Sequence, residues 1–151
     1  MRIVLQRVSR SAVVADGETT GQIGTGLLAL VGVATGDTGA DASIAAAKTV
    51  GMRIFPDEAG KMNRSVADAD GAVLVVSQFT LLADVRKGRR PAFTAAARPE
   101  EAIPVLEAFT EAIEAEGVRV AHGRFGAHME VDLLNDGPVT IVFDVQKGRI
   151  R

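Results

Sequence analysis

Hydrophobic and polar residues alternate along the first third of the chain as they do in β-strands. The alternation runs through residues 2–15, Asp16-Gly17 is a typical hairpin signal, and a short strand is expected over 19–23. After a glycine-rich turn, the apolar segment 27–33 has the composition of a further strand. This density of strand segments predicts a sheet and argues against a helical bundle.

The middle of the chain contains helical and extended patterns in turn. Residues 42–50 are rich in alanine and predict a helix, with Asp37 or Asp41 as its N-cap. Residues 53–56 are expected to be extended, because their terminal proline disfavours the helical region for the residue before it. An almost unbroken apolar run over 72–79 predicts a strand buried on both faces.

The last third of the chain begins with a helix over most of 101–116, which Gly117 should end. Pro104 either kinks this helix or marks its first turn. Three strands are expected after it, over residues 118–122, 129–134 and 139–145. The basic tail, 147–151, is expected to fray. Because no linker or repeat interrupts the pattern, we predict one α/β domain (of the α+β kind) over 1–151, built mostly from antiparallel strands.

Composition narrows the function classes. The chain has 151 residues, of which 47% are hydrophobic and 24% charged, and no cysteine, which excludes thiol nucleophiles, disulfides and cysteine-type zinc sites. A net charge of −2 disfavours polyanion binding by overall charge, although a local basic cluster is compatible with it. The start does not resemble a signal peptide, and the longest apolar stretch is too short for a membrane span. We therefore expect a soluble, cytoplasmic protein with no membrane association.

Several familiar catalytic signatures are missing. The sequence has no Walker loop, no His-Glu-x-x-His and no Gly-x-Ser-x-Gly elbow, and its early glycines lie between strands, which disfavours a dinucleotide site. His128, Glu130 and Asp132 share one face of a predicted strand and have a spacing that could hold a metal, but a solvated polar face is the better interpretation. His122 is expected at the surface near a strand end. A Ser-His-Asp triad stays open by spacing, although no motif marks one, and we expect no metal and no cofactor.

Three polar segments carry a stronger signal. Ser77-Gln78-Phe79-Thr80-Leu81 ends a buried strand in hydroxyl, amide and backbone N–H groups, which can hold a carbonyl oxygen or simply satisfy the turn. Arg86-Lys87-Gly88-Arg89-Arg90-Pro91 places four cations in five positions, enough for one or two phosphates. Asn135-Asp136-Gly137-Pro138-Val139-Thr140, taken alone, predicts a hairpin turn.

Taken together, these segments resemble the D-aminoacyl-tRNA deacylase family, and the likeness runs the length of the chain. Besides the three segments, it is carried by Gln6-Arg7-Val8, Gly24-Thr25-Gly26-Leu27-Leu28, Gly32-Val33, Arg53-Ile54-Phe55, Gly60-Lys61-Met62-Asn63, Gly123-Arg124-Phe125-Gly126-Ala127 and Met129. The chain departs from the family pattern at His128, where aspartate is usual, at Ala92, where serine is usual, at Leu82, and in its extra basic tail.

The resemblance implies a homodimer of barrel-like subunits with two main helices. It also implies a cis Gly137-Pro138 bond, braced by Arg7, which enters the partner's active site. There, backbone carbonyls would reject an L side chain while accepting a D side chain or glycine.

The resemblance further implies a catalytic segment formed by Ser77, Gln78, Phe79 and Thr80. The N–H groups around Gln78 and Phe79 would bind the ester carbonyl. Thr80 is the obvious protein nucleophile, but no acid or base beside it in the sequence could activate it. A neighbouring hydroxyl of the RNA is the favoured source of reactivity.

The same likeness assigns the substrate contacts. Phe125 and Met129 would contact the terminal adenosine of the tRNA, and Lys87, Arg89 and Arg90 would meet phosphates of the acceptor end. The implied reaction is hydrolysis of D-aminoacyl-tRNA, and of glycine mischarged on tRNA, with no role for DNA. Two alternatives stay open: a general esterase for small D-amino acid esters, and a non-catalytic RNA-binding module.

Overall fold

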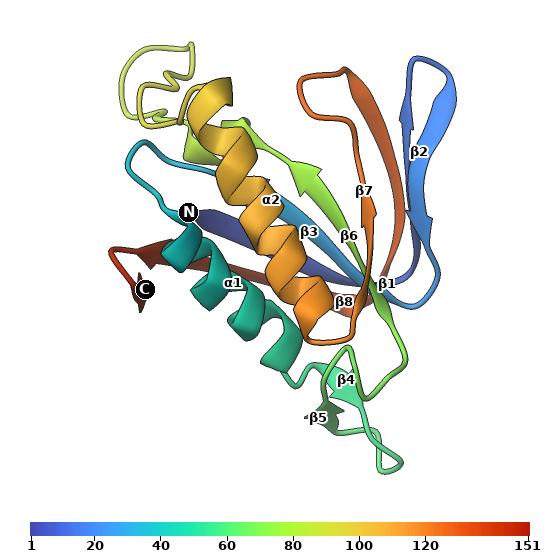
Figure 1. Cartoon of the computed structure of the whole chain (residues 1–151). Coiled ribbons are helices and arrows are strands. Elements are labelled where there is room, and N and C mark those ends of the chain that lie inside the picture. The colour runs from blue at the N-terminus through green and yellow to red at the C-terminus, as the bar shows by residue number, and fades with distance from the viewer.

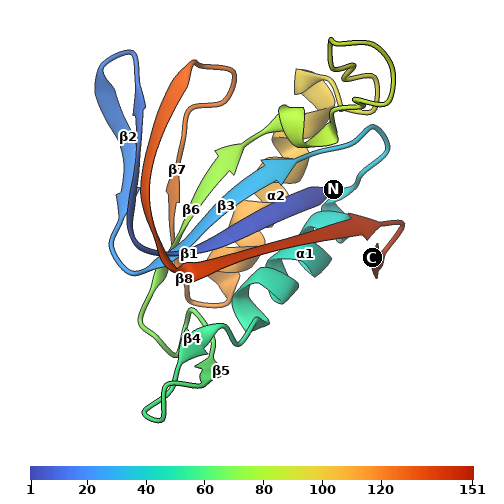
Figure 2. The ribbon, with the colours of Figure 1, turned by 180° about the vertical axis from the view of Figure 1, so that it is seen from behind.

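The computed structural model describes residues 1–151 as a curled seven-stranded sheet with two helices on one face. Figures 1 and 2 show the helices lying side by side across the sheet and the strands at one end curling over to form a half-barrel. The predicted α/β class, the barrel-like core and the two main helices are confirmed. No helix in the structure combines the length and the apolar character needed to cross a membrane.

The main sheet has the strand order β7-β6-β3-β1-β8-β9, and β2 also pairs with β1. Its strands are β1 (Arg2–Ala15), β2 (Glu18–Ile23), β3 (Gly26–Gly32), β6 (Ala72–Ser77), β7 (Arg119–His122), β8 (Met129–Gln146) and β9 (Arg149–Ile150). A separate two-stranded ribbon is formed by β4 (Phe55–Pro56) and β5 (Met62–Arg64). Most pairings are antiparallel, as predicted, but β6 runs parallel to both β3 and β7. The sheet is therefore mixed.

The half-barrel closes where β2 approaches β7. Asp16 and Gly17 both have positive φ, which gives the tight hairpin turn that the Asp-Gly pair predicts. At Gly21 a side chain would place its Cβ 2.3 Å from the carbonyl oxygen of His122, so only glycine permits this approach. The curled end encloses a small apolar cluster that includes Val13, Leu74 and neighbours from β1, β3 and β6.

Both helices begin earlier than predicted, and the first has a different cap. α1 (Gly39–Gly51) is capped by Thr38, whose side chain forms a reciprocal capping box with Asp41, so Asp41 is its third residue and not the cap itself. α2 (Pro99–Ala115) begins with a proline at N1, five positions before Pro104. Pro104 is therefore inside the helix, and the interpretation that it marks the first turn is wrong.

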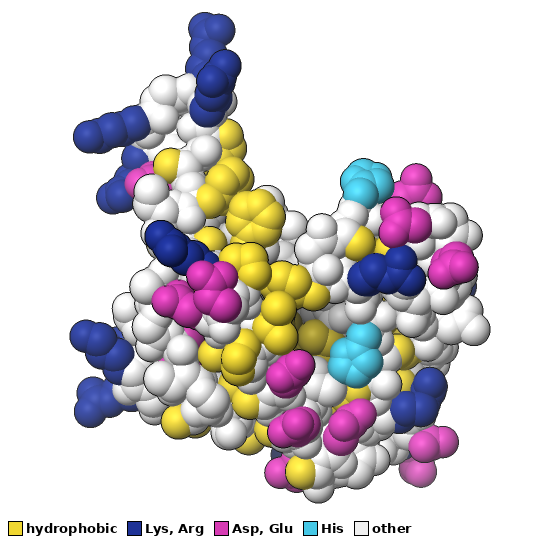
Figure 3. Space-filling view, turned by 45° about the horizontal axis from the view of Figure 1, so that its top comes forward, with side chains coloured by type: hydrophobic (Ala, Val, Ile, Leu, Met, Phe, Trp, Pro, Cys, Tyr) yellow, Lys and Arg dark blue, Asp and Glu magenta, His cyan; other side chains and the backbone are white.

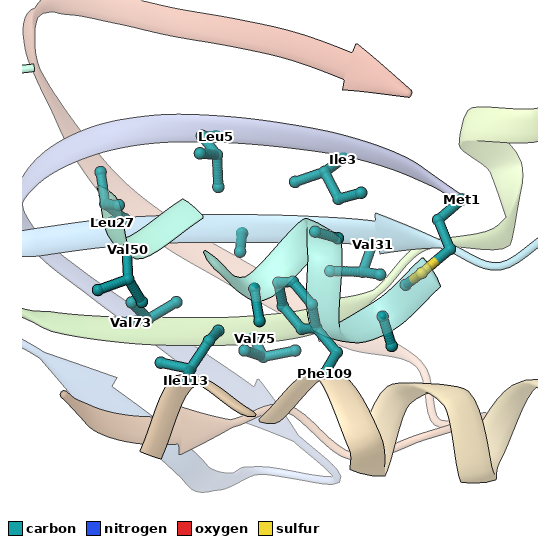
Figure 4. Packing of buried hydrophobic residues seen from close by; sticks show 14 of the residues in the cluster. Met1, Ile3, Leu5, Leu27, Val31, Val50, Val73, Val75, Phe109 and Ile113 are labelled. Carbon is teal, nitrogen blue, oxygen red and sulfur yellow. The ribbon is translucent and has the colours of Figure 1, made fainter. Parts of the chain in front are cut away.

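The main core lies between the helices and the sheet. Figure 4 shows side chains of β1, β3 and β6 meeting Phe109 and Ile113 of α2 and Val50 of α1. Ile3, Leu5 and Phe109 are fully buried there. Burying side chains of this size contributes about 1.5–3 kcal/mol each, which fixes the helices against the sheet.

Two predictions for the end of the chain are wrong. Residues 129–146 form one strand, β8, which continues through the expected hairpin turn. The tail does not fray, because β9 pairs with β8 and the backbone of Arg151 exchanges hydrogen bonds with Asp144. The continuous strand β8 holds the Asn135–Thr140 segment in a fixed position. The pairing of β9 with β8 does the same for the basic C-terminal hairpin.

Candidate functional site

The polar segment after β6 forms a tight turn. β6 ends at Ser77, and the short 3-10 helix η1 (Phe79–Leu82) follows directly. The N–H of Gln78 donates to the carbonyl of Val31 at 2.8 Å, so it is already engaged, contrary to the expectation that it faces a ligand. The N–H groups of Phe79 and Thr80 open the 3-10 helix, where the first N–H groups have no acceptor within the helix, and no side chain accepts from them. These two donors are free to bind a carbonyl oxygen.

The hydroxyl of Thr80 is poorly placed to act as a nucleophile. Its oxygen accepts a hydrogen bond from the side-chain amide of Gln78, and neither a carboxylate nor an imidazole is hydrogen-bonded to it. A hydroxyl with no adjacent base stays protonated and weakly nucleophilic. The turn therefore supplies hydrogen bonds and no evident base.

A pocket of about 490 Å³ lies beside this turn. Its walls come from the turn, from the start of α2 and from the segment leading into β8, and its residues include Ser77, Gln78, Phe79, Ala97, Pro99, Phe125, His128, Met129 and Val131. Three residues of the predicted catalytic segment, Ser77, Gln78 and Phe79, thus share one cavity with the distant Phe125–Met129 wall, whereas Thr80 does not line it. Figure 3 shows a hollowed apolar surface running across this face.

Two exposed aromatic side chains stand at this pocket. Phe79 is 53% exposed and Phe125 is 40% exposed, whereas the other four phenylalanines are buried or half-buried. Phe79 is held edge-on against Phe93, with ring centroids 5.1 Å apart. Exposed rings on a fixed frame are suited to stacking against a nucleobase.

The structure does not arrange His128, Glu130 and Asp132 as a metal site. His128 lines the pocket, but no group of three or more His, Asp or Glu side chains in the chain is arranged to hold an ion. Asp132 instead forms an ion pair with Arg10 on β1.

The Gly137-Pro138 segment forms an exposed bulge in β8. Residues 136–139 lie opposite the single residue Arg7, because Asn135 pairs with Val8 while Thr140 pairs with Gln6. The Gly137-Pro138 bond is cis, and Gly137 has φ of +131°.

Hydrogen bonds of the Arg7 and Asn135 side chains hold the bulge in place. Arg7 is 8% exposed and donates to the carbonyl of Asp136 at 3.1 Å and to the carbonyl of Ile54 at 2.6 Å. The amide oxygen of Asn135 accepts from the N–H of Val139 at 3.0 Å. The resemblance pointed to Arg7, but the anchoring role of the Ile54 carbonyl had no sequence signal, because nothing local links these distant positions.

The bulge is far from the turn of its own chain. Gly137 lies beside Arg7, which pairs with Leu27, which in turn pairs with Val73. The path to Ser77 then crosses three strand spacings of about 4.8 Å and follows β6 for four residues at about 3.3 Å each. The separation is roughly 20 Å, so the bulge does not reach the pocket of the same chain.

The basic loop projects from the sheet next to η1. An antiparallel bridge between Asp84 and Ala92 closes its base. The guanidinium of Arg86 pairs with Asp84 at 2.6 Å, which lowers the pKa of that carboxyl. Lys87, Arg89 and Arg90 are exposed and have no acidic partner, so they are free to meet phosphates. Arg86 is not.

Comparison with known proteins places this architecture in a class. The fold matches a solved structure of the c-Myc DNA Unwinding Element Binding Protein with a TM-score of 0.90 and 38% identity, covering 97% of this chain and 99% of that one. A structure described as a probable eukaryotic D-amino acid tRNA deacylase shares the fold with a TM-score of 0.82 at 18% identity, covering 95% and 98% of the two chains.

Sequence relatives make the assignment specific. A profile of the D-Tyr-tRNA(Tyr) deacylase family matches residues 4–144. D-aminoacyl-tRNA deacylases of Symbiobacterium thermophilum and Deinococcus deserti are 56% and 58% identical, over 97% of both chains in the first case and over 96% of this chain and 99% of the relative in the second. The chain belongs to the D-Tyr-tRNA(Tyr) deacylase family. It is therefore a hydrolase, as the sequence predicted.

Proposed function

We propose that this enzyme hydrolyses the ester bond of D-aminoacyl-tRNA and rejects the L form with a bulge supplied by a second copy of the chain. Family membership supports the reaction class. The observation that carries the finer claim is the position of Gly137-Pro138, exposed and braced, yet roughly 20 Å from the turn of its own chain. At that distance, the bulge can contribute to this kind of pocket only in a second copy of the chain.

The surface around the bulge is suited to pairing with a second copy. Leu134 and Val142 lie on β8 on either side of the bulge and are 51% and 59% exposed. Exposed apolar side chains flanking a rigid projection are typical of a surface that another protein covers. A two-fold dimer would place each bulge in the partner's pocket by the same contacts.

The chemistry assigned to the pocket needs no protein base. The ester carbonyl accepts hydrogen bonds from the N–H groups of Phe79 and Thr80, and the terminal adenosine stacks between Phe79 and Phe125 beside Met129. One donor of this kind typically contributes about 10²–10³ in rate. Water attacks the carbonyl carbon, the ester C–O bond breaks, and the ribose oxygen leaves with a proton. The adjacent ribose hydroxyl positions that water, and proximity of this kind is worth roughly 7–11 kcal/mol.

Handedness is sorted by the main chain. A D side chain points away from the bulge, an L side chain meets its carbonyls, and glycine has no side chain to reject, so glycine mischarged on tRNA is also a substrate. Because the contact is made by backbone atoms, it is indifferent to which D-amino acid is attached.

Lys87, Arg89 and Arg90 hold phosphates of the acceptor end, and the enzyme works where tRNA is charged, in the cytoplasm.

A hydrolysis assay on D-Tyr-tRNA and L-Tyr-tRNA, run beside a sizing column, tests this function. The proposal expects release of D-tyrosine, little release of L-tyrosine and elution as a dimer. Hydrolysis of small D-amino acid esters as fast as of D-Tyr-tRNA would indicate a general esterase. Binding of tRNA without any hydrolysis would indicate an RNA-binding module. Either result would overturn the proposal.

A further inference from the structure

A second concave surface, of about 410 Å³, lies between the start of β1 and the C-terminal hairpin. Its charged lining residues are Arg2, Asp37, Asp144, Lys147 and Arg151. This surface is separate from the pocket described above, because the two cavities share no lining residue. The family profile ends at residue 144, so two of its cations lie beyond the matched segment.

The acidic groups of this surface are already neutralised. Asp37 pairs with the N-terminal ammonium of Met1 at 2.6 Å. Asp144 receives two hydrogen bonds of 2.8 Å from the guanidinium of Arg2, which keep the pKa of its carboxyl below the usual value. Lys147 and Arg151 have no acidic partner. The cavity therefore presents two cationic side chains that no acidic side chain neutralises.

The hairpin that carries these cations is held in place. Lys147 and Gly148 have φ of 51° and 70° and form its turn, and Ile150 pairs with Val145. The N–H of Gly148 donates to the carboxylate of Asp41 at 2.8 Å, which ties the turn to α1. The cations thus sit on ordered backbone, which limits the conformational entropy lost when they bind a ligand.

The basic surface adjoins the turn that follows β6. Arg2 donates through Nη1 to the carbonyl of Leu81 at 3.2 Å, and Leu82 lines the cavity. Figures 1 and 2 show the C-terminal hairpin and the 86–91 loop on the same side of the molecule. A nucleic-acid strand leaving the pocket toward this side would meet cations on either side of η1.

We propose that Lys147 and Arg151 bind backbone phosphates of the tRNA acceptor arm, at a distance from the terminal adenosine. The inference rests on the proposed function and extends it with a contact that lies outside the family's matched segment. Its chemistry is recognition of phosphate by charge, which positions the RNA without reading its bases.

The test compares a double variant, Lys147→Asn with Arg151→Gln, with a matched control, Lys61→Gln with Arg119→Gln. Asparagine tolerates the positive φ at position 147. The control removes the same charge from exposed cations that do not line this cavity. Substrates are D-Tyr-tRNA and 3′-D-tyrosyl-adenosine, which has no acceptor arm, and binding of uncharged tRNA is measured separately.

For the double variant, we expect about a tenfold loss of tRNA affinity and of kcat/KM on D-Tyr-tRNA, and a salt-dependence slope smaller by roughly two contacts. Activity on the adenosine ester should stay unchanged, and the control should behave as wild type. Unchanged tRNA binding, or an equal loss on both substrates, would overturn the inference. Absence of hydrolysis by the wild type, with binding weakened only in the double variant, would instead overturn the proposed function.

Discussion

Arg7 and Asp136 are joined through both the backbone and the side chain of the aspartate. The Arg7 Nε donates to the carbonyl oxygen of Asp136 at 3.1 Å and lies 3.2 Å from its carboxylate. The same guanidinium holds the carbonyl of Ile54. A planar group with several fixed donors suits this position, and a lysine could not reproduce the arrangement. This buried side chain, together with the amide of Asn135, braces the bulge that bears Gly137-Pro138.

Replacing this arginine by lysine should therefore make the bulge less rigid while leaving the residues of the pocket in place. We expect Arg7→Lys to cost about 1–3 kcal/mol of unfolding free energy, because buried carbonyls lose their donors. Its ratio of D-Tyr-tRNA to L-Tyr-tRNA hydrolysis should fall at least tenfold. Urea unfolding and single-turnover deacylation measure the two effects. Arg10→Lys, at an exposed ion pair with Asp132, is the control and should change neither.

The role of Thr80 can be separated from that of the RNA. Thr80→Ala keeps the backbone N–H and removes only the hydroxyl, so we expect deacylation to persist within about tenfold. A tRNA ending in 2′-deoxyadenosine should be hydrolysed at least 10³-fold more slowly, in line with the size of proximity effects. Two results together would make the threonine the nucleophile. Thr80→Ala would lose all activity while keeping a normal circular dichroism spectrum, and the wild type would hydrolyse the deoxy substrate at full rate.

The basic loop offers an internal comparison. Changing Lys87, Arg89 and Arg90 to glutamine should weaken tRNA binding by about tenfold or more and reduce its dependence on salt. Arg86→Gln should have little effect, because Asp84 already occupies that guanidinium. Filter binding at several salt concentrations makes the measurement. Duplex DNA should compete poorly with tRNA for the wild type, and equal competition would contradict the predicted preference.

A stability prediction concerns Asp41. Hydrogen bonds from the N–H of Gly148 and from Thr38 lower the pKa of its carboxyl, so the ionised form is favoured by folding. Its contribution is complete above the carboxyl's unfolded pKa and is lost as the pH falls through the lower, folded pKa. Asp41→Asn should cost about 0.5–2 kcal/mol at pH 7, because hydrogen bonds to an ionised group are lost, and less at pH 3.

Thermal or urea unfolding at both pH values checks this behaviour. The exposed Glu58→Gln substitution serves as the control. An equal cost at both pH values would show that shape, and not charge, makes Asp41 important.

The strands and helices were largely readable from the sequence because their patterns are local. The period-two alternation of residues 2–15 and the alanine-rich run before Val50 correspond closely to β1 and α1. The class of site could also be inferred, because the Ser77–Leu81 and Asn135–Thr140 segments carry specific motifs.

What the sequence did not reveal depends on distant partners. Asn135–Thr140 has the composition of a hairpin turn, yet β8 passes through it because Arg7 and Asn135 satisfy the bulged backbone. The tail pairs with β8 and docks onto Asp41. The N–H of Gln78 is occupied by Val31, a partner on another strand. None of these contacts leaves a pattern in neighbouring residues.

The most direct test of the central claim uses mixed dimers. One subunit carries Gly137→Ala, where a Cβ would lie 2.8 Å from Val139 and 3.1 Å from Arg7. The other carries Thr80→Pro, which removes a proposed carbonyl donor. The Gly137→Ala homodimer should hydrolyse without rejecting the L form, and the Thr80→Pro homodimer should not hydrolyse. The differently tagged, purified heterodimer should regain D hydrolysis with L rejection at one of its two sites, where an intact pocket receives the partner's intact bulge. A heterodimer as defective as its parents, or a selective Gly137→Ala homodimer, would contradict donation of the bulge across subunits.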